Sequence, residues 1–283
     1  MSSNVHFHGA NRANPVQSQV AGIGEILSLW KNRRALKALV RHDLRKTYAS
    51  ATRGIIWTLL TPLTTILVFS AVFAFGLRIS LGGAPYIFGF AAAYIPWVLI
   101  SSSITGATGS ILEHRYLVKR VLFPIEIIPA DAFIVHSAPH AVLVSVAFIA
   151  CLVGGYARFP DLLLVLYFYA CAAVLTVSVG LLVSSLTVVA RDFQQMLPAM
   201  LQLWFWLTPV AWSSGHFPPA MQTLLGINPA SYIVSGYRHA LMPGVFPAPT
   251  AFESAAFWII CLGTLTLGSI CFRRFRVYFW DCL

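Results

Sequence analysis

Six long stretches without a charged residue dominate this 283-residue sequence, the shortest with 19 residues and the longest with 45. A helix needs about 20 mainly apolar residues to cross the roughly 30 Å hydrocarbon core of a bilayer. One spanning helix in each stretch accounts for the pattern, and the short alternating strands of a membrane β-barrel are not seen. We therefore predict an all-α membrane protein with six spans, at 54–77, 87–109, 132–154, 162–188, 195–213 and 254–272.

The composition excludes most soluble classes. Only 10% of the residues are charged and 58% are hydrophobic, whereas a soluble domain carries about 25% charged residues. A soluble enzyme, a disordered chain and a secreted disulfide scaffold are therefore excluded. The net charge of +10 would suggest a nucleic-acid partner in a soluble protein. Here we expect no nucleic acid, and membrane lipids as the neighbours of the chain.

The basic residues predict the orientation. With the N-terminus in the cytoplasm, the inner segments hold 16 of the Lys and Arg residues and the outer segments hold 3. This asymmetry places both termini on the cytoplasmic side. We expect a flexible tail at 1–24, a membrane domain at 51–272 and a C-terminal tail at 273–283. Residues 1–22 lack the apolar core of a cleavable signal peptide.

Residues 25–50 have the pattern of an amphipathic helix at the membrane surface. At about 100° per residue, Leu36 and Val40 share one side while Arg34 and Arg41 share another. This arrangement suits an interface with anionic lipids, although a basic tail that only sets topology is the alternative. Asp43 falls on the apolar side, where it pairs with a basic neighbour or meets a partner protein.

Two connecting segments are unusual. The segment 110–131 is short, mixed in charge and interrupted by prolines, so it could present a small helix to a cytoplasmic partner or be a plain connector. The segment 214–250 contains six prolines but keeps apolar pieces. Asn228 and Pro229 form the start of a helix, with Asn as N-cap and Pro at the first position. We predict two short re-entrant helices there that act as an extracytoplasmic gate; a plain loop is the alternative.

Catalytic motifs were not found in the sequence. It has no GxxxxGK[ST] phosphate loop, no HExxH and no GxSxG. We therefore expect no catalytic residue, no metal and no cofactor on this chain. His136 and His140 lie four residues apart in the third predicted span. Interhelical hydrogen bonding is the favoured interpretation, and a proton relay is the alternative.

The aromatic residues suggest a path for a sugar. Phe69 and Phe73 lie four residues apart on one face of the first span. Flat apolar rings suit the C–H faces of sugars, whereas contact with lipid is the alternative for any single ring. The candidate path residues are Trp57, Phe69, Phe73, Trp204, Phe205 and Trp206.

Several short motifs occur in order between residues 36 and 240. They read LVRHDLRKTYASATRGIIWTLLTPL, YLVKRVLFPIEIIP, ARDF, LTPV and NPASYIVSGYR. With these motifs the chain resembles the membrane subunit of ABC exporters that move lipid-linked polysaccharides such as O-antigen, capsule and teichoic acid. The matching positions include Asp43, Tyr48, Gly54, Trp57, Pro62, Leu117, Pro129, Arg191, Asp192, Thr208 and Pro209.

The resemblance implies a transport subunit of the bacterial inner membrane rather than an enzyme. Two copies would form the pathway, with spans one and five at their interface. Each copy would bind a cytoplasmic ABC ATPase, which would hold ATP and magnesium. The residues implied for ATPase coupling are Glu113, Arg115, Lys119, Arg120, Phe123, Pro124 and Glu126, and those implied for the gate are Asn228, Pro229, Tyr237 and Arg238.

Three alternative functions remain open at this point. A drug or small-lipid exporter would share the fold but need no aromatic lining. A proton-coupled secondary transporter would need a titrating group inside the membrane. A membrane-embedded transferase would need a catalytic constellation.

Overall fold

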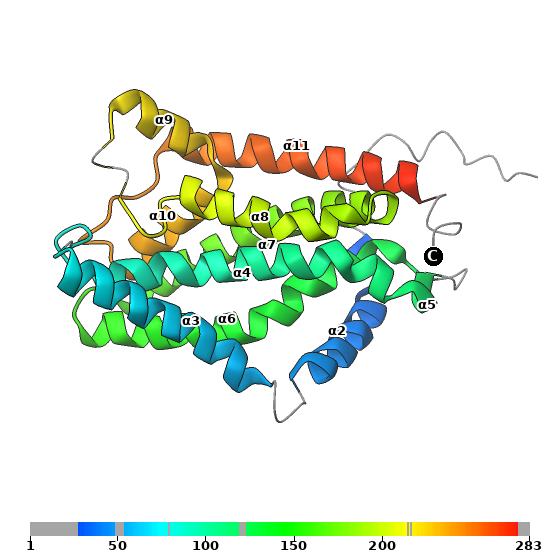
Figure 1. Cartoon of the computed structure of the whole chain (residues 1–283), viewed down its shortest axis with the longest axis horizontal. Helices are drawn as coiled ribbons and strands as arrows, with labels where there is room; N and C mark the ends of the chain where they lie inside the picture. The colour runs from blue at the N-terminus through cyan, green and yellow to red at the C-terminus, as the bar shows by residue number, and fades with distance from the viewer. Residues whose placement is uncertain are drawn as a thin grey trace, which may run out of the picture.

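The computed structural model describes residues 28–48, 54–78, 80–118, 123–213, 215 and 217–276. Within these residues the regular structure is helical, apart from one isolated bridge between Leu81 and Ala84. The prediction of an all-α protein is therefore confirmed. Figure 1 shows long helices that run side by side along the longest axis of the molecule. They are α3 (Ile55–Ser70), α4 (Tyr86–Glu113), α6 (Ile128–Val153), α7 (Leu162–Val189), α8 (Asp192–Leu207) and α11 (Ala251–Phe275).

Five helical segments are long and apolar enough to cross a membrane: Ile56–Gly76, Tyr86–Glu113, Ile125–Val153, Phe159–Val189 and Ala251–Phe275. The fifth predicted span corresponds to α8, whose 16 residues cover only about 24 Å. The helix ends because proline disfavours a helical conformation in the residue before it. Thr208, which precedes Pro209, is extended with φ −106° and ψ 133°. The rest of the predicted span is irregular backbone.

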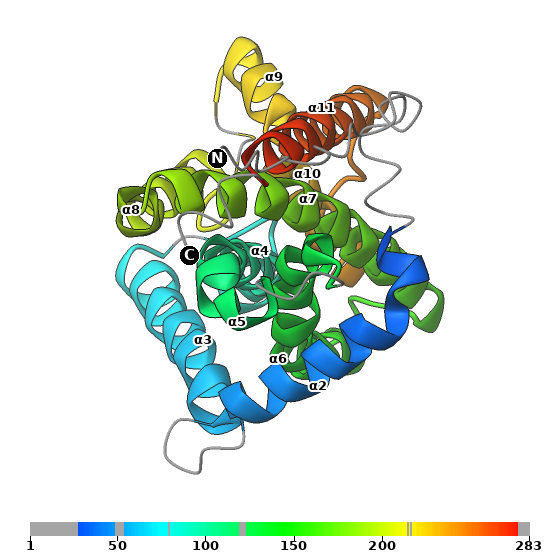
Figure 2. The same cartoon turned by 90° about the vertical axis from the view of Figure 1, so that its right-hand side faces the viewer.

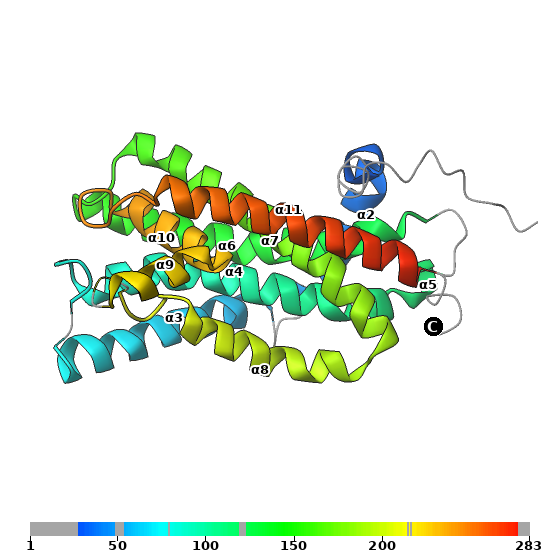
Figure 3. The same cartoon turned by 90° about the horizontal axis from the view of Figure 1, so that it is seen from above.

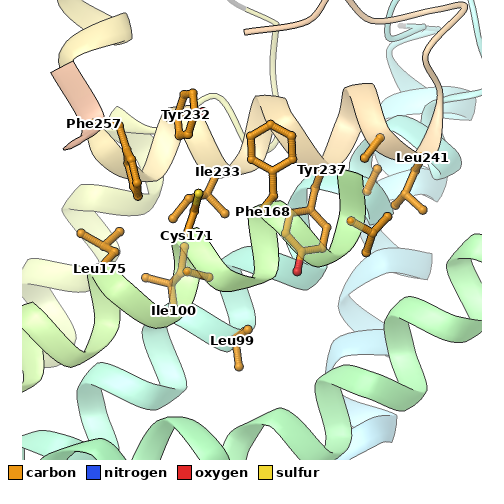
Figure 4. Close-up of a cluster of buried hydrophobic side chains, with 14 of the residues drawn as sticks. Leu99, Ile100, Phe168, Cys171, Leu175, Tyr232, Ile233, Tyr237, Leu241 and Phe257 are labelled. Atoms are coloured by element: carbon orange, nitrogen blue, oxygen red, sulfur yellow. The ribbon is translucent and has the colours of Figure 1, made fainter. Parts of the chain in front are cut away.

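The central helix of the bundle is α4. Figure 2 shows it end-on, surrounded by α3, α6, α7 and α8. Of its most apolar stretch 61% is buried, compared with 17% for the span that contains α3. A large core cluster joins α4 to α7, α10 (Pro229–Leu241) and α11. Figure 4 shows part of this cluster, including Leu99, Phe168, Tyr237 and Phe257.

The two ends of the bundle carry different short elements (Figures 1 and 3). One end carries α2 (Arg33–Tyr48), α5 (Arg115–Val118) and the turn η3 (Ile125–Ile127). The other end carries α9 (Pro219–Ile227), α10 and the π-helical turn η2 (Ala71–Gly76) that continues α3. In Figure 2, α2 runs across the end of the bundle rather than along it.

Several boundaries differ from those expected. Residues 110–113 belong to α4 and residues 128–131 belong to α6, so the connector between these helices is shorter than 110–131. Arg273 and Arg274 lie in the last turn of α11 instead of the tail. Basic residues favour the C-terminal end of a helix because they complement its dipole.

Candidate translocation groove and outer gate

Stacked aromatic rings join α3 to α4. The rings of Phe69 and Phe73 are nearly parallel with centroids 5.8 Å apart. Phe69 also stacks on Phe90 at 5.0 Å, and Phe73 stacks on Tyr86 at 5.1 Å. The row continues from Phe90 to Tyr94 at 5.3 Å. The spacing of four residues between Tyr86, Phe90 and Tyr94 was the signal in the sequence that could have identified α4 as the partner of these rings.

An open groove of about 420 Å³ lies next to this row, between α3, α4 and α8. Its lining combines aromatic rings with hydroxyl and amide groups. The hydroxyls of Thr65 and Thr105 donate to carbonyls of their own helices, which leaves oxygen lone pairs free to accept from a solute. The lining residues are Thr65, Phe69, Tyr94, Trp97, Ser101, Thr105, Pro198, Leu201, Gln202 and Phe205.

The six candidate path aromatics occupy different environments. Phe69 and Phe205 line the groove, and Phe73 lies in the adjoining stack. The side chains of Trp57 and Trp206 are 59% and 50% exposed and are not among the groove lining. Trp204 packs edge-on against Trp97 with centroids 5.7 Å apart. The structure therefore brings three of the six residues to the groove or its border.

The irregular segment after α8 is held by side chains from other helices. The guanidinium of Arg238 on α10 donates to the carbonyls of Pro209 at 2.8 Å, Val210 at 2.7 Å and Trp212 at 3.3 Å. The hydroxyl of Tyr86 donates to the fourth carbonyl, that of Ala211, at 2.8 Å. Backbone groups inside a membrane protein need such partners wherever a helix is interrupted.

Arg238 is itself buried, with 4% of its surface exposed. Its Nε donates to the carbonyl of Gly89 on α4 at 3.0 Å, and its guanidinium lies over the ring of Phe246 at 5.5 Å. The partners of this charge are thus carbonyl dipoles just beyond the negative end of α8. Arg238 joins α4, α8 and α10 at one point.

Asn228 performs a similar role between α8 and α10. Its Oδ1 caps α10 by accepting from the backbone N of Ala230 at 3.0 Å, and it also accepts from the indole of Trp204 at 2.9 Å. Its amide donates to the carbonyl of Leu207 at 3.2 Å and to Oγ1 of Thr208 at 3.0 Å. The predicted N-cap is confirmed, and Pro229 occupies the first turn of α10 as expected.

Replacing Asn228 with alanine should therefore lower the free energy of unfolding by about 2–3 kcal/mol, because a cap and several hydrogen bonds, most of them partly buried, are lost together. The measurement is a titration of the purified protein from mild detergent into SDS. Asn32→Ala is the matched control, since the Asn32 amide bonds only locally to Ser28. Equal losses in the two variants would contradict the assigned role.

Tyr237 is fully buried and lies within 3.0 Å of Nε2 of His140 through its hydroxyl. The interhelical hydrogen bond predicted for this histidine is therefore present. His136 lines two small cavities along α6. The four candidate gate residues are thus packed or hydrogen-bonded at the start and along the length of α10, while α9 exposes most of its surface.

At the opposite end, the candidate coupling residues form two ion pairs. Glu113 lies 3.4 Å from Nζ of Lys46 on α2, and Glu126 lies 3.0 Å from Arg276 at the end of α11. Arg115 is exposed, and Phe123 and Pro124 are partly exposed. Lys119 and Arg120 lie outside the residues that the structure describes.

A buried pair at this end was missed by the sequence analysis. Oδ2 of Asp43 on α2 lies 3.1 Å from Nε2 of His114, which follows the last residue of α4. Asp43 therefore pairs with a residue from another helix, and its Oδ1 also lies 3.9 Å from Nε2 of the neighbouring His42 on α2. Asp43 and His114 are 71 positions apart, so no local pattern could reveal their contact.

Comparison with known proteins places this architecture in a family. Residues 34–242 match the model of the ABC-2 type transporter family. The chain is 26% identical over 217 residues to the O-antigen export system permease protein RfbA of Myxococcus xanthus, covering 75% of this chain and 82% of that protein. It is 22% identical over 211 residues to the protein of the same name from Klebsiella pneumoniae, covering 74% and 81%. The matched region contains both the groove and the hydrogen bonds of Arg238 and Asn228, and the chain belongs to the ABC-2 type transporter family.

Proposed function

We propose that this chain is the transmembrane subunit of an ATP-driven exporter that moves a lipid-linked polysaccharide across the bacterial inner membrane. The observation that carries the proposal is the groove between α3, α4 and α8, whose lining contains both flat aromatic rings and hydroxyl and amide groups. Rings pack on the apolar faces of sugars, and polar groups bond their hydroxyls. The similarity to O-antigen export permeases supports the same substrate class.

We propose that the chain crosses the membrane six times, with α8 and the segment after it as the fifth crossing. The helix alone covers about 24 Å, and irregular backbone at membrane depth is tolerated where protein surrounds it. Arg238 and Tyr86 donate hydrogen bonds to backbone carbonyls of this segment, which supports this arrangement. The excess of Lys and Arg in the predicted inner segments supports cytoplasmic termini.

We also propose a homodimer with the groove at its interface. The helices α3 and α8 lie on the same side of the bundle (Figures 2 and 3), and both carry exposed apolar residues. The groove opens between these two helices, with α4 as its floor. A second copy related by a two-fold axis would present the same surface and close the groove into a path. The exposed apolar residues on this side include Ile56, Trp57, Leu67, Met200, Leu203, Trp206 and Leu207.

The energy source is proposed to be a separate cytoplasmic ABC ATPase that binds this chain through α5 and the connector around it. The short α5 projects at the end of the bundle that carries α2 (Figure 1). Its exposed Arg115 and Tyr116 provide a contact surface for such a partner.

The groove is tested by replacing rings with leucine, which keeps apolar volume but removes the flat face. We expect Phe69→Leu and Phe205→Leu each to lower export by about three- to tenfold, because an aromatic contact contributes about 0.5–1.5 kcal/mol beyond its buried area. The measurement is surface polysaccharide on cells that depend on the variant, with protein abundance measured by immunoblot.

Phe252→Leu is the matched control, because this ring lies on α11 with 53% of its surface exposed. Export at the wild-type rate in both groove variants would reject the proposed path. Equal losses in all three variants would indicate a general effect on the protein.

A further inference from the structure

The contact between α2 and the bundle contains a buried ion pair. The side chain of His114 is 6% exposed and that of Asp43 is 13% exposed. Nδ1 of His114 lies 2.8 Å from the carbonyl of Ser110. A carbonyl only accepts, so Nδ1 must carry a proton. The contact of Nε2 with Asp43 then requires a second proton on the ring or one on the carboxyl group. The pair of His114 and Asp43 therefore carries one proton more than a neutral histidine beside an ionised carboxylate would carry.

Asp131 of α6 lies beside the same Asp43 carboxyl group. A cavity of about 190 Å³ adjoins these three residues, and one carboxyl oxygen each of Asp43 and Asp131 has no hydrogen-bond partner. The cluster therefore joins α2, the end of α4 and the first turn of α6. The other titratable groups around it are His42, Lys46 and Tyr48 on α2, Glu113 on α4, and His136 on α6.

The position of His114 connects this cluster to the proposed ATPase contact. It directly follows Glu113, the last residue of α4, and directly precedes Arg115, the first residue of α5. We infer that Asp43 and His114 form a proton-dependent latch that holds α2 on the bundle and thereby positions α5. They act as positioning residues, and the second half of the inference rests on the proposed function, in which α5 meets an ATPase.

The latch predicts a defined dependence on pH. The hydrogen bond to Asp43 raises the pKa of His114 above its ordinary value of 6.5, against the effect of burial, which lowers it. Stabilisation from a raised pKa is complete below the ordinary value and is lost as the pH rises through the raised one. Burial raises the pKa of Asp43, but its interactions with His114 and Asp131 outweigh this, and the pKa is lowered. The loss on the acid side therefore belongs to Asp43, and His114 contributes to the loss on the alkaline side together with the adjoining Asp131.

The first experiment measures hydrogen exchange of the α2 backbone in the full chain, reconstituted in nanodiscs, between about pH 6 and about pH 9. Exchange is expressed relative to an unstructured peptide at each pH. We expect His114→Gln to lower the protection of α2 at neutral pH by about tenfold or more, since it leaves a buried carboxylate without its cation. The same variant should reduce the alkaline loss of protection that the wild type shows.

Three further variants test whether the effect of His114→Gln comes from the loss of its pairing with Asp43. Asp43→Asn combined with His114→Gln removes both charges and should recover part of the protection at neutral pH, with a weaker dependence on pH than the wild type. Exchanging the residues, as Asp43→His with His114→Asp, restores a pair and should restore pH dependence. Lys46→Ala is the matched control, because it removes an ion pair between α2 and α4 whose side chains are 60% and 58% exposed. Such exposed pairs contribute little, so protection should stay at the wild-type value.

The second experiment measures ATP hydrolysis by the partner ATPase with each variant in proteoliposomes. We expect His114→Gln to lower stimulation severalfold and to reduce the alkaline limb of its pH profile, with Lys46→Ala unchanged. Unchanged protection of α2 in His114→Gln would overturn the latch. Lowered protection with normal stimulation would overturn the positioning of α5. If the wild-type chain itself fails to stimulate the ATPase, the proposed function fails, while hydrogen exchange still decides the latch.

Discussion

Replacing Arg238 with alanine is expected to lower the free energy of unfolding by about 3–5 kcal/mol, the largest effect of any side-chain truncation proposed for this protein. The guanidinium bonds to the carbonyls of Gly89, Pro209, Val210 and Trp212. Its removal takes this donor away from the carbonyls of Pro209, Val210 and Trp212, in a segment where the helix ladder has already ended. The measurement is SDS titration of the purified protein.

Arg238→Lys tests whether the positive charge of Arg238 or the shape of its guanidinium group provides the stability. An ammonium group keeps the positive charge beside the end of α8 but cannot reproduce the planar fork that reaches four carbonyls from one position. We expect an intermediate loss of stability. Arg158→Ala is the matched control because this side chain is exposed, and it should leave the unfolding free energy within about 0.5 kcal/mol of the wild type. A loss in Arg238→Ala no larger than that of the control would contradict the role assigned to Arg238.

The helical fold could be predicted because its causes are local. Long uncharged runs require spanning helices, and the order Asn228 then Pro229 specifies the start of a helix whatever surrounds it. The break at Thr208 also has a local cause in Pro209, but the predicted span continues to residue 213 because it follows hydropathy alone. Hydropathy measures whether a segment tolerates lipid, and it does not distinguish a helix from irregular backbone that other residues satisfy.

The candidate sites depend on contacts between residues that are distant in the sequence. The sequence therefore indicated some of their residues but not the contacts that these residues make. Phe69 and Phe73 were selected for their spacing on one helix, while the stacking of Phe73 on Tyr86 depends on how α3 packs against α4. Arg238 was selected through family resemblance, which does not reveal its carbonyl partners. His114 was not selected at all, because its contact with Asp43 exists only once α2 crosses the end of the bundle.

The second large effect is expected at Gly236, in the middle of α10. This helix packs so closely on α7 that a Cβ atom at position 236 would overlap the ring of Phe168. Phe168 and the neighbouring Tyr237 lie in the packed region between the two helices in Figure 4. The ring has little freedom to move, because it packs edge-on against both Tyr167 and Tyr232 with centroids 5.0 and 5.4 Å away. Gly236→Ala should therefore lower the free energy of unfolding by about 3 kcal/mol, at the upper end for overpacking.

A second substitution tests whether the overlap is the cause. Phe168→Leu removes the ring, so in combination with Gly236→Ala it should recover part of the lost stability, whereas independent defects would add. Gly263→Ala is the matched control, since a Cβ at that position on α11 meets no atom within 4 Å. There the methyl group should be neutral or stabilise the helix by up to about 1 kcal/mol.

Gly236→Ala also tests whether the contacts of Tyr237 and Arg238 depend on the close packing of α10 against α7. Tyr237 and Arg238 directly follow Gly236, so an α10 displaced from α7 carries both side chains away from their partners. We expect export to fall in Gly236→Ala and to recover in part with Phe168→Leu. If stability recovers in the double variant while export stays lost, close seating of α10 is required for transport itself and not only for folding.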